Sequence, residues 1–456
     1  MKPCPLSLLI VILCANAALA VERYLDITAT GSANGTSRVN AWTNPTNITG
    51  LLDGDLLWVY PGTYAGKLEI LNIPNLTIRI DQGSTNPAVF PFMQFSNCDD
   101  SLVDGLVGTN QLFWVTGDHP TLFHSVNWRL SSNFICRGVS IDRSAWYSAD
   151  TNQQHGIRVW NECGKFVIEQ CSVANTSGDG INVTQIDYTG SASFKYDWIM
   201  IRDCTLTRLG DDGVQLGSNR RATMRNCIVR QLGFETFFSA HPDGVQLNPD
   251  GGNLMVDGNF FEDNTQNIFT EWCSSNIVII NNVVRNTHTN GAYMGVACSI
   301  REPFTGDFIL ANNVFVDFFG YGAISASYPT NRTNTRVSNN VFIDCKRGMI
   351  STNYTSYIET NNLWYDTPGV LWYDTDGNIV PAVVPRNFGT AQNLNPMMTA
   401  DYRTILGSPA RNAGLDLSAW FVTDKSGDTR TVPWDIGPYE FNPVIRRINV
   451  KTLRIK

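Results

Sequence analysis

The sequence predicts an all-β solenoid, a single-stranded right-handed parallel β-helix with coils of about 21–33 residues. One short pattern, apolar-x-x-Cys/Asn-x-apolar, recurs through the middle and second half of the chain. Each recurrence lies among short β-rich runs broken by Gly, Asn and Asp, with no helical periodicity between them. A repeat of about 20–50 residues is typical of solenoids and propellers. The right hand follows from the general rule for parallel β connections.

The repeat begins at Ile168 as Ile-Glu-Gln-Cys-Ser-Val and is last seen at Ile358 as Ile-Glu-Thr-Asn-Asn-Leu. Successive starts lie 33, 23, 32, 23, 31, 27 and 21 residues apart. The shortest spacing suits three short strands and three turns, so the longer coils carry loops. Stacked coils place the Cys/Asn positions in one column about 4.8 Å apart, and we assign this column to the scaffold and not to a metal site. Its members are Cys171, Cys204, Cys227, Asn259, Asn282, Asn313, Asn340 and Asn361.

The two ends of the chain set the compartment and the domain bounds. A positive residue, a short apolar run and the small-residue sequence Ala18-Leu19-Ala20 predict a cleaved signal peptide over residues 1–20. The protein is therefore expected to be secreted and extracellular. We expect one β-helix domain over residues 21–441. Residues 442–456 hold five basic and no acidic residues, which predicts a short flexible tail.

The charge of the chain excludes some partners. The 456 residues include 33 Lys and Arg and 41 Asp and Glu, for a net charge of −8. An acidic chain lacks the basic surface of a nucleic-acid binder, and no segment after the signal approaches the roughly 20 apolar residues of a membrane span. We expect a monomer with neither partner. Residues 195–230 are locally basic, which fits either scattered solvated charge or a patch that attracts an anionic polymer.

A second element follows a turn in each coil, and in three adjacent coils it begins with Asp-Gly. Alternation along a strand points its apolar residue inward and its last polar residue outward. Asp-Gly is also a common turn dipeptide. Three stacked carboxylates, however, repel one another unless they share a proton or bind a cation, so we predict a functional site here. The four copies are His155-Gly-Ile-Arg158, Asp179-Gly-Ile-Asn182, Asp212-Gly-Val-Gln215 and Asp243-Gly-Val-Gln246.

We predict Asp179, Asp212, Asp243 and His241 as catalytic residues. Clustered carboxylates can hold Ca²⁺ through their oxygens, so calcium is the candidate cofactor. Its candidate ligands are Asp211, Asp212 and Asp243. Aromatic rings such as Trp160 and Trp198 offer flat surfaces to sugars, although ordinary packing also explains each of them. The candidate substrate-binding residues are His155, Arg158, Asn182, Gln215, Gln246, Arg220, Arg221 and Trp160.

More specific motifs lie at the two ends of the predicted helix. Gly54-Asp55 leads into Pro61-Gly-Thr-Tyr64, and the sequence Asp435-Ile-Gly-Pro-Tyr-Glu-Phe441 closes the helix. Together with the repeat, they resemble the pectate-lyase-like superfamily of right-handed parallel β-helices, in particular its chondroitinase-B-like and alginate-lyase-like secreted members. The resemblance implies this fold and an enzyme acting on carbohydrate. Asp179-Gly-Ile and Gly210-Asp-Asp are also similar to two polygalacturonase motifs, but the Gly-His-Gly and Arg-Ile-Lys motifs of that family are absent.

The predicted function is cleavage of an acidic, uronic-acid-containing polysaccharide by a lyase. A cation would neutralise the substrate carboxylate while His241 or His155 removes the adjacent proton in a β-elimination. A glycoside hydrolase is the first alternative, since carboxylates on adjacent coils lie roughly 5 Å apart and those two coils apart roughly 9–10 Å. A C5-epimerase would use nearly the same groups. The alternative from another class is a non-catalytic polysaccharide-binding or adhesive β-helix.

Overall fold

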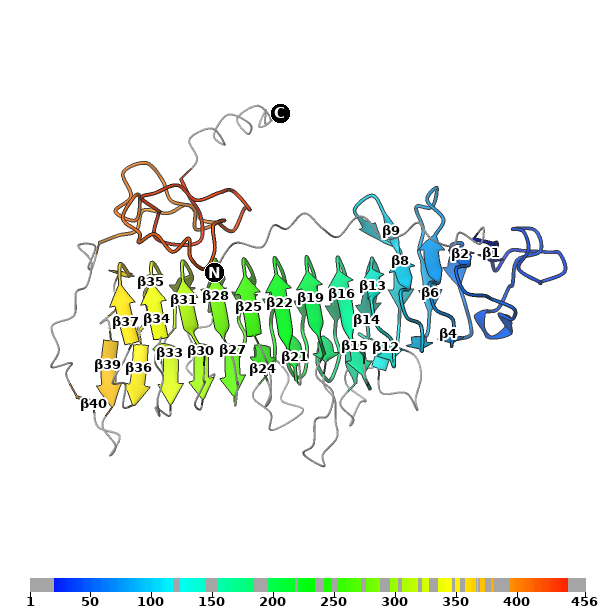
Figure 1. The fold of residues 1–456 in the computed structure, drawn as a ribbon, viewed down its shortest axis with the longest axis horizontal. Helices are drawn as coiled ribbons and strands as arrows, with labels where there is room; N and C mark the ends of the chain where they lie inside the picture. The colour runs from blue at the N-terminus through cyan, green and yellow to red at the C-terminus, as the bar shows by residue number, and fades with distance from the viewer. Residues whose placement is uncertain are drawn as a thin grey trace.

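The structure, a computed structural model, is an elongated stack of short strands with a strand-free C-terminal segment along one edge (Figure 1). Among the residues that it describes, no helix has the length and hydropathy to cross a membrane. The described ranges are 20–117, 124–144, 154–161, 163–183, 196–217, 220–233, 242–247, 253–271, 276–287, 296–301, 306–318, 322–327, 335–346, 349–352, 357–365, 367, 370–373, 379–380 and 394–441.

Sheet A is a 13-stranded parallel sheet that receives one strand from each coil. It begins at the N-terminal end, where β1 pairs in parallel with β2, so the first coil forms where the sequence predicts it. Its strands are β1 (Glu22–Leu25), β2 (Leu56–Val59), β5 (Thr77–Ile80), β8 (Leu102–Asp104), β13 (Phe134–Arg137), β16 (Lys165–Glu169), β19 (Trp198–Arg202), β22 (Arg221–Arg225), β25 (Asn253–Asp257), β28 (Ile277–Ile280), β31 (Phe308–Ala311), β34 (Thr335–Ser338) and β37 (Tyr357–Thr360).

Sheet B is a 12-stranded parallel sheet that follows sheet A in each coil. Its strands are β3 (Gly62–Thr63), β6 (Ala88–Phe90), β11 (Phe113–Val115), β14 (Val139–Asp142), β17 (Ser172–Ala174), β20 (Thr205–Thr207), β23 (Ile228–Arg230), β26 (Phe260–Glu262), β29 (Val283–Arg285), β32 (Val314–Val316), β35 (Val341–Ile343) and β38 (Leu363–Tyr365). A short hairpin, β9 (Leu106–Val107) with β10 (Asn110–Gln111), and the 3-10 helix η1 (Pro45–Asn47) lie outside the three sheets.

Sheet C is the third face of the solenoid, and all its strands but the last pair in parallel. It carries the Asp-Gly elements. Its strands are β4 (Leu68–Leu71), β7 (Met93–Ser96), β12 (His124–Arg129), β15 (His155–Trp160), β18 (Ile181–Val183), β21 (Val214–Leu216), β24 (Asp243–Leu247), β27 (Gln266–Glu271), β30 (Val296–Arg301), β33 (Gly322–Ser327), β36 (Met349–Thr352), β39 (Val370–Tyr373) and β40 (Ile379–Val380).

The core runs along the axis of the solenoid, because alternate residues of each strand point inward. In β19, for example, Ile199 and Ile201 are buried, whereas Met200 between them faces outward. Parallel register places like residues above one another. Phe134 stacks on Phe166 with ring centroids 5.0 Å apart, so aromatic rings pack from coil to coil in the core.

The Cys/Asn column is confirmed as scaffold at the turn from sheet A to sheet B. Asn259 N–H donates to Asn282 Oδ1 at 2.8 Å, and Asn282 Nδ2 donates to the Val256 carbonyl at 2.9 Å. The side chain of one coil therefore satisfies the buried backbone of the coil before it. In the earlier coils burial raises the pKa of Cys227 well above its ordinary value, so its sulfur stays a thiol and packs as an apolar group.

The predicted last member of this column was wrong by one residue. Asn340 N–H donates to Asn362 Oδ1 at 2.9 Å, so Asn362 continues the ladder in place of Asn361. The strand register explains the shift, because Glu359 and not Ile358 lies opposite Val337. Asn361 takes the left-handed position before the ladder, with φ of 55°.

The C-terminal segment over residues 394–441 packs along the turns of the last coils (Figure 1). Asn312 Nδ2 donates to the carbonyl of Asp435 at 2.9 Å, and Arg430 Nη2 donates to Asn281 Oδ1 at 2.7 Å. These contacts make the closing Asp435–Phe441 motif a docking element. Residues 1–19 and 442–456 lie outside the described residues, so the signal peptide, the tail and the domain bounds stay predictions.

Candidate active site on sheet C

A column of titratable side chains stacks at the beginning of the sheet C strands. In β12 and β15, His124 pairs with His155. In the next coils the backbone keeps this register, for example through the Gly180 N–H, which donates to the carbonyl of Asp212 at 2.9 Å. We call these five residues the titratable column. They are His124, His155, Asp179, Asp212 and Asp243.

The Gly of each Asp-Gly pair is required by close packing between coils. A Cβ on Gly213 would lie 2.4 Å from the carbonyl oxygen of Gly244 and 2.6 Å from a methyl group of Val229. A Cβ on Gly180 would lie 2.8 Å from the carbonyl oxygen of Gly213. Both contacts are closer than real Cβ atoms allow, so only Gly fits. This half of the motif is structural.

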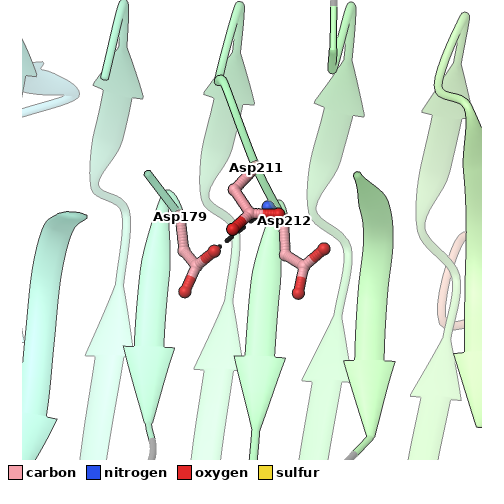
Figure 2. Close-up of side chains that lie close together, drawn as sticks. All are labelled: Asp179, Asp211 and Asp212. Carbon is pink, nitrogen blue, oxygen red and sulfur yellow. Dashed lines mark hydrogen bonds between the residues drawn. The ribbon is translucent and has the colours of Figure 1, made fainter. Parts of the chain in front are cut away.

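Two Asp residues of the column also have a structural task. Asp212 N–H donates to Asp179 Oδ1 at 3.1 Å (Figure 2), and Asp243 N–H donates to Asp212 Oδ1 at 2.8 Å. The Asn ladder performs the same task with neutral amides, as between Asn259 and Asn282. A neutral Asn in place of Asp179 or Asp212 would therefore accept the same backbone hydrogen bond. These hydrogen bonds explain why an acceptor stands at these positions of the titratable column. They do not explain why the acceptor is an ionisable Asp.

Asp211 completes a tight group of carboxyls. Oxygens of Asp179, Asp211 and Asp212 all lie within 4.8 Å of one another (Figure 2), and their exposed fractions are 1%, 9% and 1%. Burial, together with repulsion from Asp179, raises the pKa of Asp211 to about 7. Burial and the surrounding carboxylates raise the pKa of Asp212 well above its ordinary range. Near neutral pH, Asp211 is therefore poised between its two forms, and the shift at Asp212 favours its protonated form.

Asp212 also has an unused oxygen. Its Oδ1 accepts a backbone N–H, whereas its buried Oδ2 has no hydrogen-bond partner among the described residues. A buried polar atom without a partner costs about 1–3 kcal/mol, so its retention calls for a functional explanation.

Asp179 lies among hydrogen-bond donors. Its Oδ2 accepts from Asn182 Nδ2 at 2.5 Å, and its Oδ1 accepts from the backbone of Asp212. His155 Nδ1 lies 3.0 Å from Asp179 N and 3.2 Å from Asp179 Oδ2. It can accept from the first when neutral or donate to the second when protonated. These donors can stabilise a negative charge on the Asp179 side chain.

The predicted polar ladder runs beside the carboxyls. Asn182, Gln215 and Gln246 lie in register on β18, β21 and β24. Asn182 Nδ2 donates to Gln215 Oε1 at 2.7 Å, and Gln215 Nε2 donates to Gln246 Oε1 at 3.0 Å. Arg158 heads the ladder on β15, and its guanidinium lies 4.9 Å from the ring centre of Trp160. The chain of amides fixes the side chains on the outer face next to the acids.

A family model described as a right-handed beta helix region matches residues 155–363, the part of the chain that holds this site. The protein is a right-handed parallel β-helix. A rhamnogalacturonan lyase has a similar structure at 12% identity and a TM-score of 0.51, with 70% of this chain and 87% of that chain covered. XylC in complex with xylose matches at 10% identity and a TM-score of 0.51, with 92% of this chain and 98% of that chain covered.

A third solved structure with the same fold is the GH136 lacto-N-biosidase from Eubacterium ramulus. It matches at 14% identity and a TM-score of 0.51, with 75% of this chain and 67% of that chain covered. No curated protein matches the sequence significantly. At identities this low, the similarity extends to the fold of the β-helix alone.

The carboxyl group can hold a cation, and its members differ by one residue from the predicted ligands. The group that forms is Asp179, Asp211 and Asp212, whereas Asp243 lies one coil beyond it. Ca²⁺ binds oxygens at about 2.3–2.6 Å, so two ligands of one ion lie up to about 5 Å apart, and the spacing of 4.8 Å satisfies this limit. Three carboxylates leave several of its roughly 6–8 positions for water or substrate. The unpartnered Asp212 Oδ2 fits this role.

Two predicted residues lie elsewhere and one lies outside the described residues. Arg220 and Arg221 lie at the start of sheet A strand β22, where Arg220 Nη1 donates to Asp197 Oδ1 at 3.0 Å, so they are not part of this site. Their predicted role in substrate binding stays a prediction, at a place apart from the acids. His241 falls outside the described residues.

The sequence analysis missed His124. Its ring stacks on His155 with centroids 5.0 Å apart, and its Nε2 lies 2.5 Å from Arg158 Nη1. The signal was available, because His124 precedes Val126 at the same spacing at which His155 precedes Ile157.

Proposed function

We propose that this β-helix is a carbohydrate-active enzyme that hydrolyses glycosidic bonds with Asp211 as the acid and Asp179 as the carboxylate. Hydrolysis needs one carboxylic acid to protonate the leaving oxygen and one carboxylate to attack the sugar or activate water. The pKa of Asp211 near 7 supports the first role. The donors around Asp179 support the second. The raised pKa of Asp211, beside a carboxyl that is surrounded by hydrogen-bond donors, is the observation that carries the proposal.

Other residues of the site support these two groups. The raised pKa of Asp212 favours its protonated form, which would limit the negative charge of the cluster and offer a donor to a substrate hydroxyl. His155 can pass a proton to or from Asp179 across 3.2 Å. Arg158 and Trp160 offer a cation and an aromatic face on the same sheet. Such a surface suits a uronic-acid-containing polysaccharide, met outside the cell if the predicted signal peptide is cleaved.

β-Elimination is the second candidate, since the group of Asp179, Asp211 and Asp212 can hold a cation. Bound Ca²⁺ would neutralise the carboxylate of a uronic acid and so acidify the neighbouring C–H. His155 would then be the base, because the described part of the site holds no Lys and its Arg158 is a poor proton acceptor. The two reactions differ in their product and in their need for the cation.

One assay separates the candidates. The purified protein is incubated with pectate, rhamnogalacturonan, alginate and glycosaminoglycans, with added Ca²⁺ or with EDTA. New reducing ends that form in EDTA, without ultraviolet absorbance from an unsaturated sugar, support hydrolysis. Ca²⁺-dependent absorbance supports elimination and overturns the hydrolytic proposal. Retention on a polysaccharide column without any product supports a binding protein instead.

Matched variants then test the assigned residues. Asp211→Asn and Asp179→Asn keep the shape of each side chain and remove its acid–base chemistry, so each is expected to lower kcat by about 10²–10⁴-fold. Asp428→Asn changes an exposed Asp in the C-terminal segment and serves as the control. If Asp211→Asn and Asp428→Asn are equally active, Asp211 is not the acid.

A further inference from the structure

A cavity of about 420 Å³ opens on the outer face of sheet A, away from the aspartates. It spans β13, β16, β19 and β22, and its volume lies within the range of about 300–1,000 Å³ of ligand pockets. Ile135 and Val167, both half-buried, give it an apolar floor. The half-buried Trp198 and the exposed Lys165 and Arg221 complete its wall.

The three wall residues form one column across successive coils. Lys165 pairs with Trp198, and the pairing of Ile199 with Ala222 places Arg221 next in line. A coil spacing of about 4.8 Å puts the backbones of the two cationic residues roughly 10 Å apart, with the indole between them. The column therefore presents an aromatic face between two positive charges.

These two charges are exceptional on this face of the solenoid. Arg137 is paired with Asp104 at 2.8 Å, and Arg225 with Asp257 at 3.2 Å. Within the described part of the chain, Lys165 and Arg221 have no ion-pair partner. A cation paired on the protein is part of the scaffold, whereas an unpaired cation beside an aromatic cavity is available to a ligand.

We propose that this cavity is a second saccharide-binding site, which holds a uronic-acid unit of an acidic polysaccharide. The apolar face of the sugar would stack on Trp198, and its carboxylate would lie near Lys165 or Arg221. The site goes beyond the proposed catalysis, because binding here requires no chemistry at the aspartates. It also gives the basic segment around residues 195–230 a local function.

The test measures binding in a background that cannot turn substrate over. Full-length Asp211→Asn protein is titrated by calorimetry with oligosaccharides of pectate, alginate and chondroitin, and with carboxyl-reduced pectate as the neutral probe. Trp198→Ala is expected to weaken binding about tenfold or more, and Arg221→Gln several-fold, since aromatic and Arg groups dominate such contacts. The matched control is Arg230→Gln, which changes an exposed side chain on sheet B strand β23.

The outcomes are distinguishable from a failure of the proposed catalysis, because binding is read without product. Selective weakening by Trp198→Ala and Arg221→Gln, with Arg230→Gln unchanged, supports the site. Equal weakening by Arg221→Gln and Arg230→Gln indicates unspecific charge attraction and overturns it. Tight binding of the carboxyl-reduced probe overturns the acidic ligand class, and no binding of any acidic probe overturns the site. Arg221 is exposed, so its variant tests the proposal even if Trp198→Ala fails to fold.

Discussion

Asp211→Asn is expected to stabilise the protein at alkaline pH while it lowers kcat. In the folded protein, burial and the neighbouring Asp179 raise the pKa of Asp211 to about 7, from an ordinary value of 3.8. The folded state therefore binds this proton more tightly than the unfolded chain does. The free energy of unfolding must fall as the pH rises from about 4 to about 7. Asn carries no charge at any pH and avoids this loss.

The size of the effect follows from the shift. About 3 pKa units at 1.36 kcal/mol per unit correspond to about 4 kcal/mol at pH 8. The amide of Asn must itself be buried, so a net gain of about 2–4 kcal/mol remains. With an unfolding entropy of about 2.1 cal/mol/K per residue, this amounts to a rise of roughly 2–4 °C in Tm for a chain of this length. Below pH 4 both side chains are neutral and the gain should vanish.

Differential scanning calorimetry of wild type and variant at pH 4 and pH 8 measures this difference directly. Asp428→Asn, which changes an exposed carboxylate, should move Tm by less than 1 °C at either pH, as most surface substitutions do. A gain for Asp211→Asn that is equal at both pH values, or a loss at pH 8, would refute the assigned protonation of the cluster.

Three further predictions concern the acid Asp211, the Asn ladder and the packing of Gly213. The pH profile of kcat should fall above about pH 7 as Asp211 loses its proton, and this limb should be absent in any residual activity of Asp211→Asn. Asn313→Ala should lower the free energy of unfolding by about 3 kcal/mol or more in urea titrations, because a fully buried amide with partners on both adjacent coils is removed. Gly213→Ala should destabilise by more than about 2 kcal/mol because its Cβ would meet backbone at 2.4 Å, whereas Gly83→Ala, with its nearest neighbour at 3.5 Å, should leave stability nearly unchanged.

The fold could be predicted because each coil repeats the same local requirements. A left-handed residue followed by Cys or Asn marks the turn from sheet A to sheet B, and this pattern survives any loop length elsewhere in the coil. The one misplaced member, Asn361, stands beside a second Asn. Either residue satisfies the pattern, and only the pairing of Glu359 with Val337 decides between them.

The site could be predicted only in part, because the sequence shows which residues stack in a column but not which other side chains surround them. The repeat predicts Asp179 and Asp212, and Asp211 was predicted because it stands next to Asp212 in the sequence. The structure brings the three carboxyls together. Arg221 lies apart from the acids because a residue a few positions beyond the Asp-Gly strand already belongs to the next sheet. The raised pKa of Asp211 depends on burial and on the neighbouring Asp179, which no motif encodes.

The geometry of the solenoid explains why the repulsion in this cluster appears as a pKa shift and not as movement. Backbone hydrogen bonds join each coil to the next on all three sheets, so the separation of Asp179 from Asp212 cannot increase without breaking them. The Gly residues beside both Asp leave no space for the strands to slide. Charge repulsion is then relieved by protonation, which keeps one carboxyl acidic enough to donate near neutral pH. A scaffold chosen for stacking thereby sets the chemistry of the residues that it stacks.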